Sequence, residues 1–108
     1  MTTFENFHAF RIHQDEHGHH AGIETMALEA LSPGEVVIRV KWSSVNYKDA
    51  LAGMGRGKIL RRYPLVGGID LAGTVLTSSA ARFQPGDPVL CTGSGLSETR
   101  DGGYSELA

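Results

Sequence analysis

The fold is indicated most clearly by EVVIRVKWSSVNYKDALAG, residues 35–53. In its first half, alternate residues fall on opposite faces of an extended chain. Val36, Ile38, Val40 and Trp42 share one face, and Val37, Arg39 and Lys41 share the other. This period of two predicts a β-strand over residues 36–42. The period then changes, because Ser43 or Ser44 can cap a short helix over residues 46–53 that ends in a glycine. A strand therefore delivers the chain directly to the start of a helix.

Other segments of the chain carry strand signals and are separated by turns. Near the N-terminus, Phe10 and Ile12 share one face of a strand, while Arg11 and His13 share the other. Further predicted strands cover residues 23–29, 69–77 and 89–91, and another short strand is predicted to begin within DGGYSELA, residues 101–108. Gly73 lies inside one of them and indicates a bulge or a close approach of another backbone. Short strands with one short helix predict a mainly β protein, a small antiparallel barrel or sandwich.

Composition narrows the class of protein. At 108 residues the chain is long enough for one modest core, so residues 1–108 are interpreted as one domain. With 10 basic and 12 acidic side chains the net charge is −2, which disfavours a nucleic-acid partner. The single cysteine, Cys91, excludes an internal disulfide framework. Because no signal-peptide pattern and no apolar run of about 18 residues is present, the sequence predicts a cytoplasmic protein without a membrane partner.

Alternate glycines follow the predicted helix in AGMGRGKILRR, residues 52–62. A phosphate-binding P-loop requires a glycine where Ala52 stands and a hydroxyl residue where Ile59 stands, so that motif fails. The dinucleotide fingerprint fails as well, because its third glycine would fall at a lysine. The glycines are therefore interpreted as shaping a loop, whose basic residues form either a solvated face or an attraction for a polyanionic substrate. These basic residues are Lys58, Arg61 and Arg62.

Four segments, SSVNYKDALAGMGRGKILRRYP, GIDLAGTV, RFQPGDPVLCTG and GGYSE, resemble in order and separation the N-terminal domain of the medium-chain dehydrogenase/reductase superfamily. The similarity is closest to its zinc-free branch of NADPH-dependent, quinone-oxidoreductase-like enzymes, and within that branch to acryloyl-CoA reductases. The resemblance implies a GroES-like, partly open antiparallel barrel with a short helix. It also implies an incomplete barrel, since this sequence lacks the family's late barrel strands and the Rossmann domain that binds most of NADPH. An unpaired sheet edge is then expected.

The zinc-dependent relatives in that superfamily provide a check on the metal. The resemblance places Asn46 where those relatives have a cysteine ligand, and Ile69 and Asp70 where they have a histidine–glutamate pair. An amide and an aliphatic side chain are poor zinc ligands, and Cys91 lies elsewhere. The four-cysteine structural zinc segment is missing too. The resemblance therefore implies that no zinc is bound.

The activity that the resemblance implies is metal-free hydride transfer to an activated C=C bond, most specifically the NADPH-dependent reduction of acryloyl-CoA to propanoyl-CoA. The substrate carbonyl needs a hydrogen-bond donor as negative charge develops on it. Asn46 and Tyr47 match family residues that face the nicotinamide cleft, so both are expected to be catalytic and to contact NADPH. Lys48 is expected either to meet a cofactor phosphate or to lie exposed. Substrate binding through the phosphates of CoA is expected of Lys58, Arg61 and Arg62.

Two acidic residues receive supporting roles in this interpretation. Asp49 is adjacent to Lys48 on the predicted helix and does not form an obvious ion pair with it, because neighbouring helical residues point in different directions. Asp49 is expected to orient loop amides near the cleft. Asp70 matches an acidic residue at the floor of the family's cleft, where a structural hydrogen-bonding role is favoured over proton transfer.

A histidine-rich segment lies near the N-terminus. The sequence HQDEHGHH, residues 13–20, holds His13, His17, His19 and His20 beside Asp15 and Glu16. These side chains offer enough nitrogen and oxygen atoms to ligate a metal, but a turn does not fix a tetrahedral geometry. The segment is interpreted as a solvated hairpin turn, where any bound metal would be adventitious.

Two alternative functions stay open. Within the enzymatic interpretation, a quinone or a general enone is the alternative substrate, because much of the acyl-binding cleft would come from sequence outside this chain. Outside that class, the chain is a non-enzymatic barrel that binds a partner or associates with itself as a homo-oligomer. The isolated chain is expected to be inactive as an enzyme, since the nucleotide-binding domain is not part of it.

Overall fold

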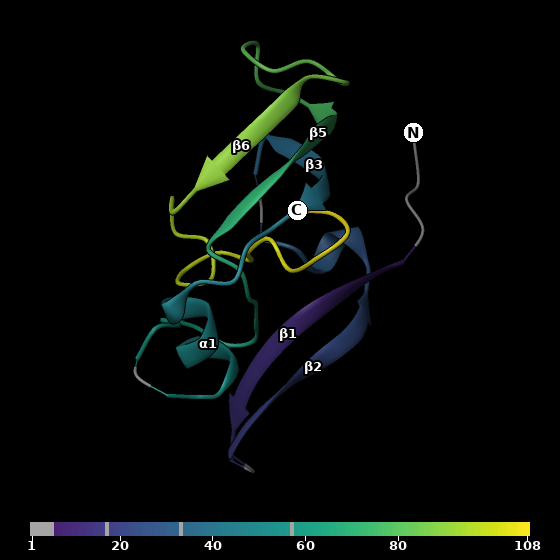
Figure 1. Ribbon diagram of the computed structural model, residues 1–108. Helices are drawn as coiled ribbons and strands as arrows, with labels where there is room; N and C mark the ends of the chain where they lie inside the picture. The colour runs from purple at the N-terminus through teal and green to yellow at the C-terminus, as the bar shows by residue number, and fades with distance from the viewer. Residues whose placement is uncertain (1–5, 17, 33, 57) are drawn as a thin grey trace.

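The computed structural model describes residues 6–16, 18–32, 34–56 and 58–108. Its elements are coloured along the chain in Figure 1. They are β1 (Phe7–Asp15), β2 (Gly18–Met26), the 3-10 helix η1 (Leu28–Ala30), β3 (Val36–Trp42), α1 (Tyr47–Gly53), β4 (Leu65–Val66), β5 (Asp70–Ser78) and β6 (Pro88–Thr92). Within the described residues the chain is therefore mainly β with one short α-helix, as predicted.

The strands form open antiparallel sheets. One sheet has the order β2-β1-β4 and the other has the order β3-β5-β6. Neither sheet closes on itself, and Figure 1 shows the long β1–β2 hairpin at one end of the molecule and the β3-β5-β6 sheet at the other. The predicted partly open antiparallel architecture is confirmed. Strands β2 and β6 lie at the outer edges of the two sheets, so each leaves one side unpaired among the described strands.

The C-terminal segment joins the two sheets, whereas the sequence predicted a short strand within residues 101–108. On one side, the Phe10 N–H of β1 donates to the Tyr104 carbonyl at 2.7 Å. On the other side, Ile38 of β3 and Ala108 exchange two main-chain bonds of 2.7 and 2.9 Å. The segment makes only isolated bridges because it divides its hydrogen bonds between two sheets. The predicted strand is wrong for that reason.

The β1–β2 hairpin begins its second strand earlier than predicted. Strand β2 starts at Gly18, and His13 pairs with His20 across the hairpin. The solvated turn predicted over residues 13–20 is therefore wrong for the two histidines of β2, His19 and His20. Main-chain pairing extends the ladder through these polar residues, because an exposed ladder does not require apolar side chains.

The two faces of β1 pack against different parts of the chain. Phe7 and Ala9 belong to a buried cluster that includes Leu107 from the C-terminal segment. Ile12 belongs to a second buried cluster, which includes Ala52 from α1. Successive strand residues point to opposite faces, so these two clusters lie on opposite sides of the strand. Strand β1 therefore fixes the helix relative to the C-terminal segment.

Strand β3 has the predicted range, but Trp42 points the other way. Its side chain is 76% exposed, although the sequence alternation placed it on the face of Val40. The pairing passes from Val40–Gly73 to Trp42–Ala72, which leaves Lys41 as an extra residue on β3. Such a bulge reverses the side to which the next residue points. The prediction for Trp42 is wrong because a register shift cannot be read from an alternating pattern.

Gly73 confirms the predicted close approach of another backbone. A Cβ atom added there would lie 2.1 Å from the main-chain oxygen of Arg39 on β3. The glycine pairs with Val40, at the point where the register shifts. A residue without a side chain thus lets β3 and β5 stay together through the bulge.

Helix α1 is capped by Asn46, so the predicted cap at Ser43 or Ser44 is wrong. The Asn46 N–H donates to the carboxylate of Asp49, three residues further on, at 3.0 Å, as in a capping box. The two serines do not cap the helix because their hydroxyls donate to Asp70. In the part of the chain that the structure describes, no helix is long and apolar enough to cross a bilayer.

Replacing Gly73 by alanine tests the bulge. We expect Gly73→Ala to lower the free energy of unfolding by about 2 kcal/mol or more, because its methyl group would overlap the Arg39 carbonyl. Gly22→Ala is the matched control, since a Cβ atom at Gly22 meets nothing within 4 Å. Urea unfolding followed by circular dichroism measures both variants. Equal losses of stability in the two variants would contradict the close approach.

Candidate functional site

Segments from four parts of the chain meet where β3 leads into α1. The connector between these elements meets the first turn of α1, the first residue of β5 and the C-terminal segment. Hydrogen bonds bring them together across long sequence separations: Asn46 and Asp70 are 24 positions apart. The residues concerned, which we call the connector cluster, are Ser44, Asn46, Asp49, Asp70 and Tyr104.

Asp49 lies at the buried centre of the connector cluster and is 5% exposed. One of its carboxylate oxygens accepts hydrogen bonds from Asn46 N and Asn46 Nδ2, both at 3.0 Å. The other oxygen accepts from Ile69 N, also at 3.0 Å. Asp49 thereby ties the start of α1 to the residue that precedes β5. Its carboxylate orients main-chain amides, as expected from the sequence.

Asp70 holds the connector from the β5 side. Its carboxylate accepts hydrogen bonds from the Ser44 N–H (2.9 Å), the Ser44 hydroxyl (2.5 Å) and Asn46 Nδ2 (3.1 Å). These donors, with the Ser44 hydroxyl the largest influence, hold the pKa of Asp70 below its usual value although partial burial opposes them. Asp70 is therefore an ionised acceptor at neutral pH, which fits a structural role better than proton transfer.

The Asn46 amide lies between two carboxylates. Its Nδ2 is 3.0 Å from Asp49 and 3.1 Å from Asp70. Since a carboxylate only accepts hydrogen bonds, the atom that faces both carboxylates is the amide nitrogen, and both of its hydrogens are engaged. Asn46 can donate to a substrate carbonyl only by giving up one of these bonds. Its catalytic and cofactor-binding roles stay predictions.

Tyr47, unlike the neighbouring Asn46, is largely exposed. It is the first residue of α1 and is 74% exposed. Its hydroxyl makes no hydrogen bond with the described residues, so the ring and the hydroxyl are both open to a ligand. The structure thus leaves Tyr47 free to act as a donor, and its roles in catalysis and in NADPH binding stay predictions.

Tyr104 completes the connector cluster and was not singled out from the sequence. Its hydroxyl donates to the Ser44 carbonyl at 2.8 Å. Burial, followed by the negative charge of Asp49, raises the pKa of Tyr104 to about 12. A Cβ atom at Gly68 would lie 2.8 Å from the ring, which also stands edge-on to Phe10. The glycine pair Gly67 and Gly68 was the signal in the sequence that could have indicated this ring, because residues without side chains leave room for one.

Lys48 faces a carboxylate. Its ammonium nitrogen lies 2.6 Å from Glu98, which is part of the loop after β6. To bind a cofactor phosphate, Lys48 would have to leave this ion pair, and its cofactor-binding role stays a prediction. Three other basic side chains are exposed and make no ion pair or hydrogen bond with the described residues. They are Lys58, Arg61 and Arg62, which we call the basic loop residues.

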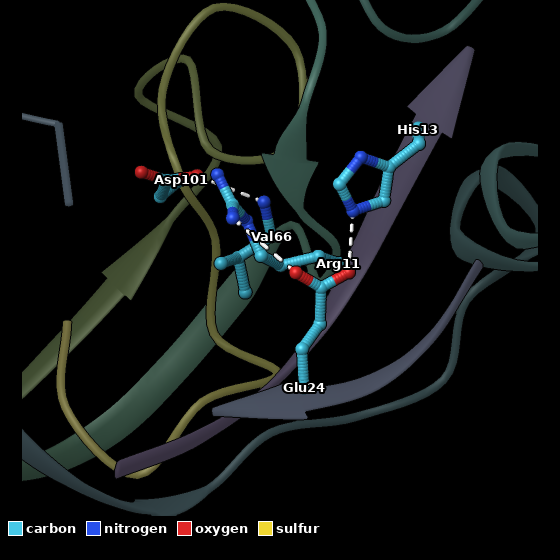
Figure 2. A network of polar contacts seen from close by, with 5 residues as sticks. All are labelled: Arg11, His13, Glu24, Val66 and Asp101. Atoms are coloured by element: carbon cyan, nitrogen blue, oxygen red, sulfur yellow. Dashed lines mark hydrogen bonds and ion pairs between the residues drawn. The ribbon is translucent and has the colours of Figure 1, made fainter. Parts of the chain in front are cut away.

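The histidine segment forms a polar network on the β1–β2 hairpin (Figure 2). His13 bonds the carboxylate of Glu24, and Arg11 donates to the same group at 3.3 Å. The ring of His13 also stacks on that of His20, with centroids 4.6 Å apart. His17 lies outside the described residues. Among the residues that are described, no group of three His, Cys, Asp or Glu side chains is placed to hold a metal ion.

Two polar residues, His19 and Asp101, fix the surroundings of the connector cluster. His19 of the hairpin lies with Nε2 3.0 Å from the Gly53 carbonyl, at the end of α1. Asp101, which is 9% exposed, accepts hydrogen bonds from Val66 N and Ser32 N, both at 2.8 Å, and the first of these bonds is drawn in Figure 2. The helix and the loop before Tyr104 are therefore both tied to strands.

Comparison with known proteins establishes the family. The model of the alcohol dehydrogenase GroES-like domain matches residues 32–108. The chain therefore belongs to the alcohol dehydrogenase GroES-like domain family, which confirms the resemblance found in the sequence.

Two sequence relatives indicate where within this family the chain falls. The chain is 50% identical over 88 residues to AcuI of Escherichia coli (strain K12), a probable acrylyl-CoA reductase, and the match covers 82% of this chain and 27% of that protein. It is 49% identical over 86 residues to YhfP of Bacillus subtilis (strain 168), a candidate quinone oxidoreductase, and here the match covers 80% of this chain and 26% of that protein. This chain thus spans less than a third of the length of either relative.

Solved structures agree with this placement. The yhdH oxidoreductase from Salmonella enterica, solved in complex with NADP, matches with a TM-score of 0.89 at 44% identity. The match covers 94% of this chain and 31% of that one. YhfP of Bacillus subtilis, solved with NAD bound, also matches with a TM-score of 0.89, at 41% identity and with 97% and 32% of the two chains covered. Both of these relatives therefore bind a nicotinamide dinucleotide.

The lowered pKa of Asp70 predicts how stability changes in acid. Because the folded-state pKa lies below the ordinary value of 3.8, the stabilisation from Asp70 is complete above that value and is lost as the pH falls through the folded-state pKa. Asp70→Asn removes this titration. We therefore expect that, as the pH is lowered below about 4, the free energy of unfolding falls less steeply in Asp70→Asn than in the parent. Urea unfolding at a series of pH values measures both, and parallel acid profiles would exclude the assigned role.

Proposed function

We propose that the chain is the N-terminal, GroES-like part of a longer, cytoplasmic, NADPH-dependent reductase of activated C=C bonds, most specifically one that converts acryloyl-CoA to propanoyl-CoA. The observation that carries this proposal is the 50% identity to a probable acrylyl-CoA reductase over 82% of the chain. The complex of the Salmonella enterica relative with NADP supports the choice of cofactor. On its own the chain is inactive, since most of the cofactor is bound by the nucleotide-binding domain of the longer protein.

The contribution of this chain is a positioned hydrogen-bond donor. When bound, NADPH supplies hydride to the β-carbon of the alkene; the C=C electrons shift toward the carbonyl, and a proton reaches the α-carbon. The carbonyl oxygen gains negative charge in this step and needs a donor. Tyr47 is exposed and its hydroxyl makes no hydrogen bond with the described residues, so it is the donor we assign first. Asn46 holds the start of the helix that carries Tyr47, and its amide hydrogens are already engaged.

The reaction proceeds without zinc in this proposal, because the donor set does not fit the metal. The three positions that match zinc ligands in the zinc-dependent relatives hold Asn46, Ile69 and Asp70. Asn46 turns its amide hydrogens toward two carboxylates. Ile69 has an aliphatic side chain, and its main-chain N–H and carbonyl are bonded to Asp49 and Gly93. Neither group can ligate Zn²⁺ in this arrangement, so one carboxylate remains where three ligands are needed.

Substitution of Tyr47 tests the assigned donor. In the longer reductase, we expect Tyr47→Phe to lower kcat for acryloyl-CoA reduction about a hundredfold, since one donor to the developing oxyanion is lost. Tyr63→Phe is the matched control, because Tyr63 is also exposed but does not belong to α1. NADPH consumption and propanoyl-CoA formation are measured together. If the two variants have the same kcat, Tyr47 is not the donor.

Substitution of the basic loop residues tests substrate binding. Replacing Lys58, Arg61 and Arg62 together by glutamine should raise KM for acryloyl-CoA about tenfold at low salt, because three exposed cations no longer meet its phosphates. Methyl vinyl ketone is the control substrate, since it has the activated C=C bond and no phosphate. Its kinetics should stay unchanged. An unaltered KM for acryloyl-CoA would remove these residues from the substrate site.

Two alternatives rest on specific observations. The 49% identity to a candidate quinone oxidoreductase favours a quinone or general enone as substrate, in which case kcat/KM with benzoquinone exceeds that with acryloyl-CoA. A non-enzymatic, self-associating barrel is favoured by the outer edge of β6, where Leu90 is 74% exposed. In that case the chain elutes as an oligomer on gel filtration and the longer reductase shows no activity with either substrate.

A further inference from the structure

The chain is locally basic around α1 although it is acidic as a whole. Residues 46–63 contain one acidic side chain, Asp49, and five basic ones, so the local charge is +4 while that of the whole chain is −2. The basic side chains are Lys48, Arg56, Lys58, Arg61 and Arg62. Asp49 is 5% exposed and bonds inward, so the surface of this segment presents mostly positive charge. Such a surface attracts anions regardless of the net charge of the protein.

One carboxylate from a distant part of the sequence lies on this basic surface. Glu98 accepts a hydrogen bond from Lys48 at 2.6 Å, and its main-chain carbonyl accepts one from the Arg61 N–H at 2.7 Å. Lys48, through its hydrogen bond and its charge, and then Arg61, through its charge, lower the pKa of Glu98. Glu98 is thus an ionised group next to two cations.

The Lys48–Glu98 ion pair is easily exchanged for another. The two side chains are 52% and 31% exposed, and exposed ion pairs contribute little to stability. A phosphate monoester carries up to two negative charges and three acceptor oxygens, so it is a stronger partner for clustered cations than one carboxylate. The side chains of the basic loop residues make no hydrogen bond or ion pair with the described residues, so they remain available to share in its binding.

We propose that Glu98 is a built-in competitor for phosphate: its carboxylate holds Lys48 until the phosphate monoester of an adenosine nucleotide takes its place beside the basic loop residues. This rests on the proposed function, because NADPH and acyl-CoA each carry one such group, on the 2′ and the 3′ oxygen of the adenosine ribose respectively. Glu98 lowers the affinity of the surface more for a singly charged anion than for a doubly charged one, because a singly charged anion carries no more charge than the carboxylate that it displaces. The carboxylate thereby favours doubly charged phosphate as the ligand.

Calorimetric titration of the protein with adenosine 2′,5′-bisphosphate and adenosine 3′,5′-bisphosphate tests the proposal. We expect Glu98→Gln to bind at least one of them about fivefold more tightly than the parent, the change that one unit charge at contact distance produces in a water-like dielectric. Glu29→Gln is the matched control, because it removes the same charge from an exposed residue of η1. Preference for the 3′,5′ compound assigns the surface to acyl-CoA, and preference for the 2′,5′ compound assigns it to NADPH.

The other outcomes separate this proposal from the proposed function. Equal affinities in the parent and Glu98→Gln, with weaker binding after replacement of the basic loop residues, overturn the competitor role and keep the phosphate site. Failure of every variant to bind either bisphosphate overturns both the competitor role of Glu98 and the phosphate site. Lys48→Met provides a second variant, and the competitor role requires it to bind more weakly than the parent. Circular dichroism of each variant confirms that the fold is unchanged.

Discussion

The buried carboxylate of Asp49 accepts hydrogen bonds from the start of α1 and from the residue before β5. One oxygen holds Asn46, and the other holds the main chain of Ile69. A buried acceptor that loses its partners retains its desolvation cost, about 1–3 kcal/mol, without compensation. The helix start and the strand start are therefore coupled, because separating them leaves part of this carboxylate unbonded. The position of Tyr47, the first residue of the helix, depends on that coupling.

Asn46 and Tyr47 are neighbours in the sequence and have opposite surroundings. The amide hydrogens of Asn46 are taken by Asp49 and Asp70, whereas Tyr47 is 74% exposed. A donor that is already bonded must break a favourable contact before it can stabilise a new charge, and a free donor pays no such cost. The pair therefore divides two tasks: Asn46 positions the helix, and Tyr47 is available for chemistry. Tyr104 supports the positioning task, since its hydroxyl holds the Ser44 carbonyl.

Local patterns predicted the features that local contacts determine. The range of β3 and the short helix follow from residues near one another in the sequence. A glycine inside a strand pattern also predicted the close approach at Gly73, although the backbone that it meets, at Arg39, is distant in the sequence. The helix cap could not be predicted, because Ser44 donates to Asp70, 26 positions away, and leaves the cap to Asn46. Tyr104 was missed for the same reason, since its partner in the connector is 60 positions away. The sequence thus predicts the elements of the site, while the contacts between them are set by tertiary packing.

Two carboxylates near α1, those of Asp49 and Glu98, have different roles, and the difference follows from how deeply each is buried. Asp49 is enclosed and satisfied by several donors, so replacing one of its partners is costly and the geometry that it imposes is fixed. Glu98 shares an exposed ion pair with Lys48, in which water and salt compete for both groups. An exchange of partners there disturbs no buried contact. A ligand phosphate can therefore displace the outer carboxylate while the inner one keeps Tyr47 in place, so binding at the surface and alignment of the donor are compatible.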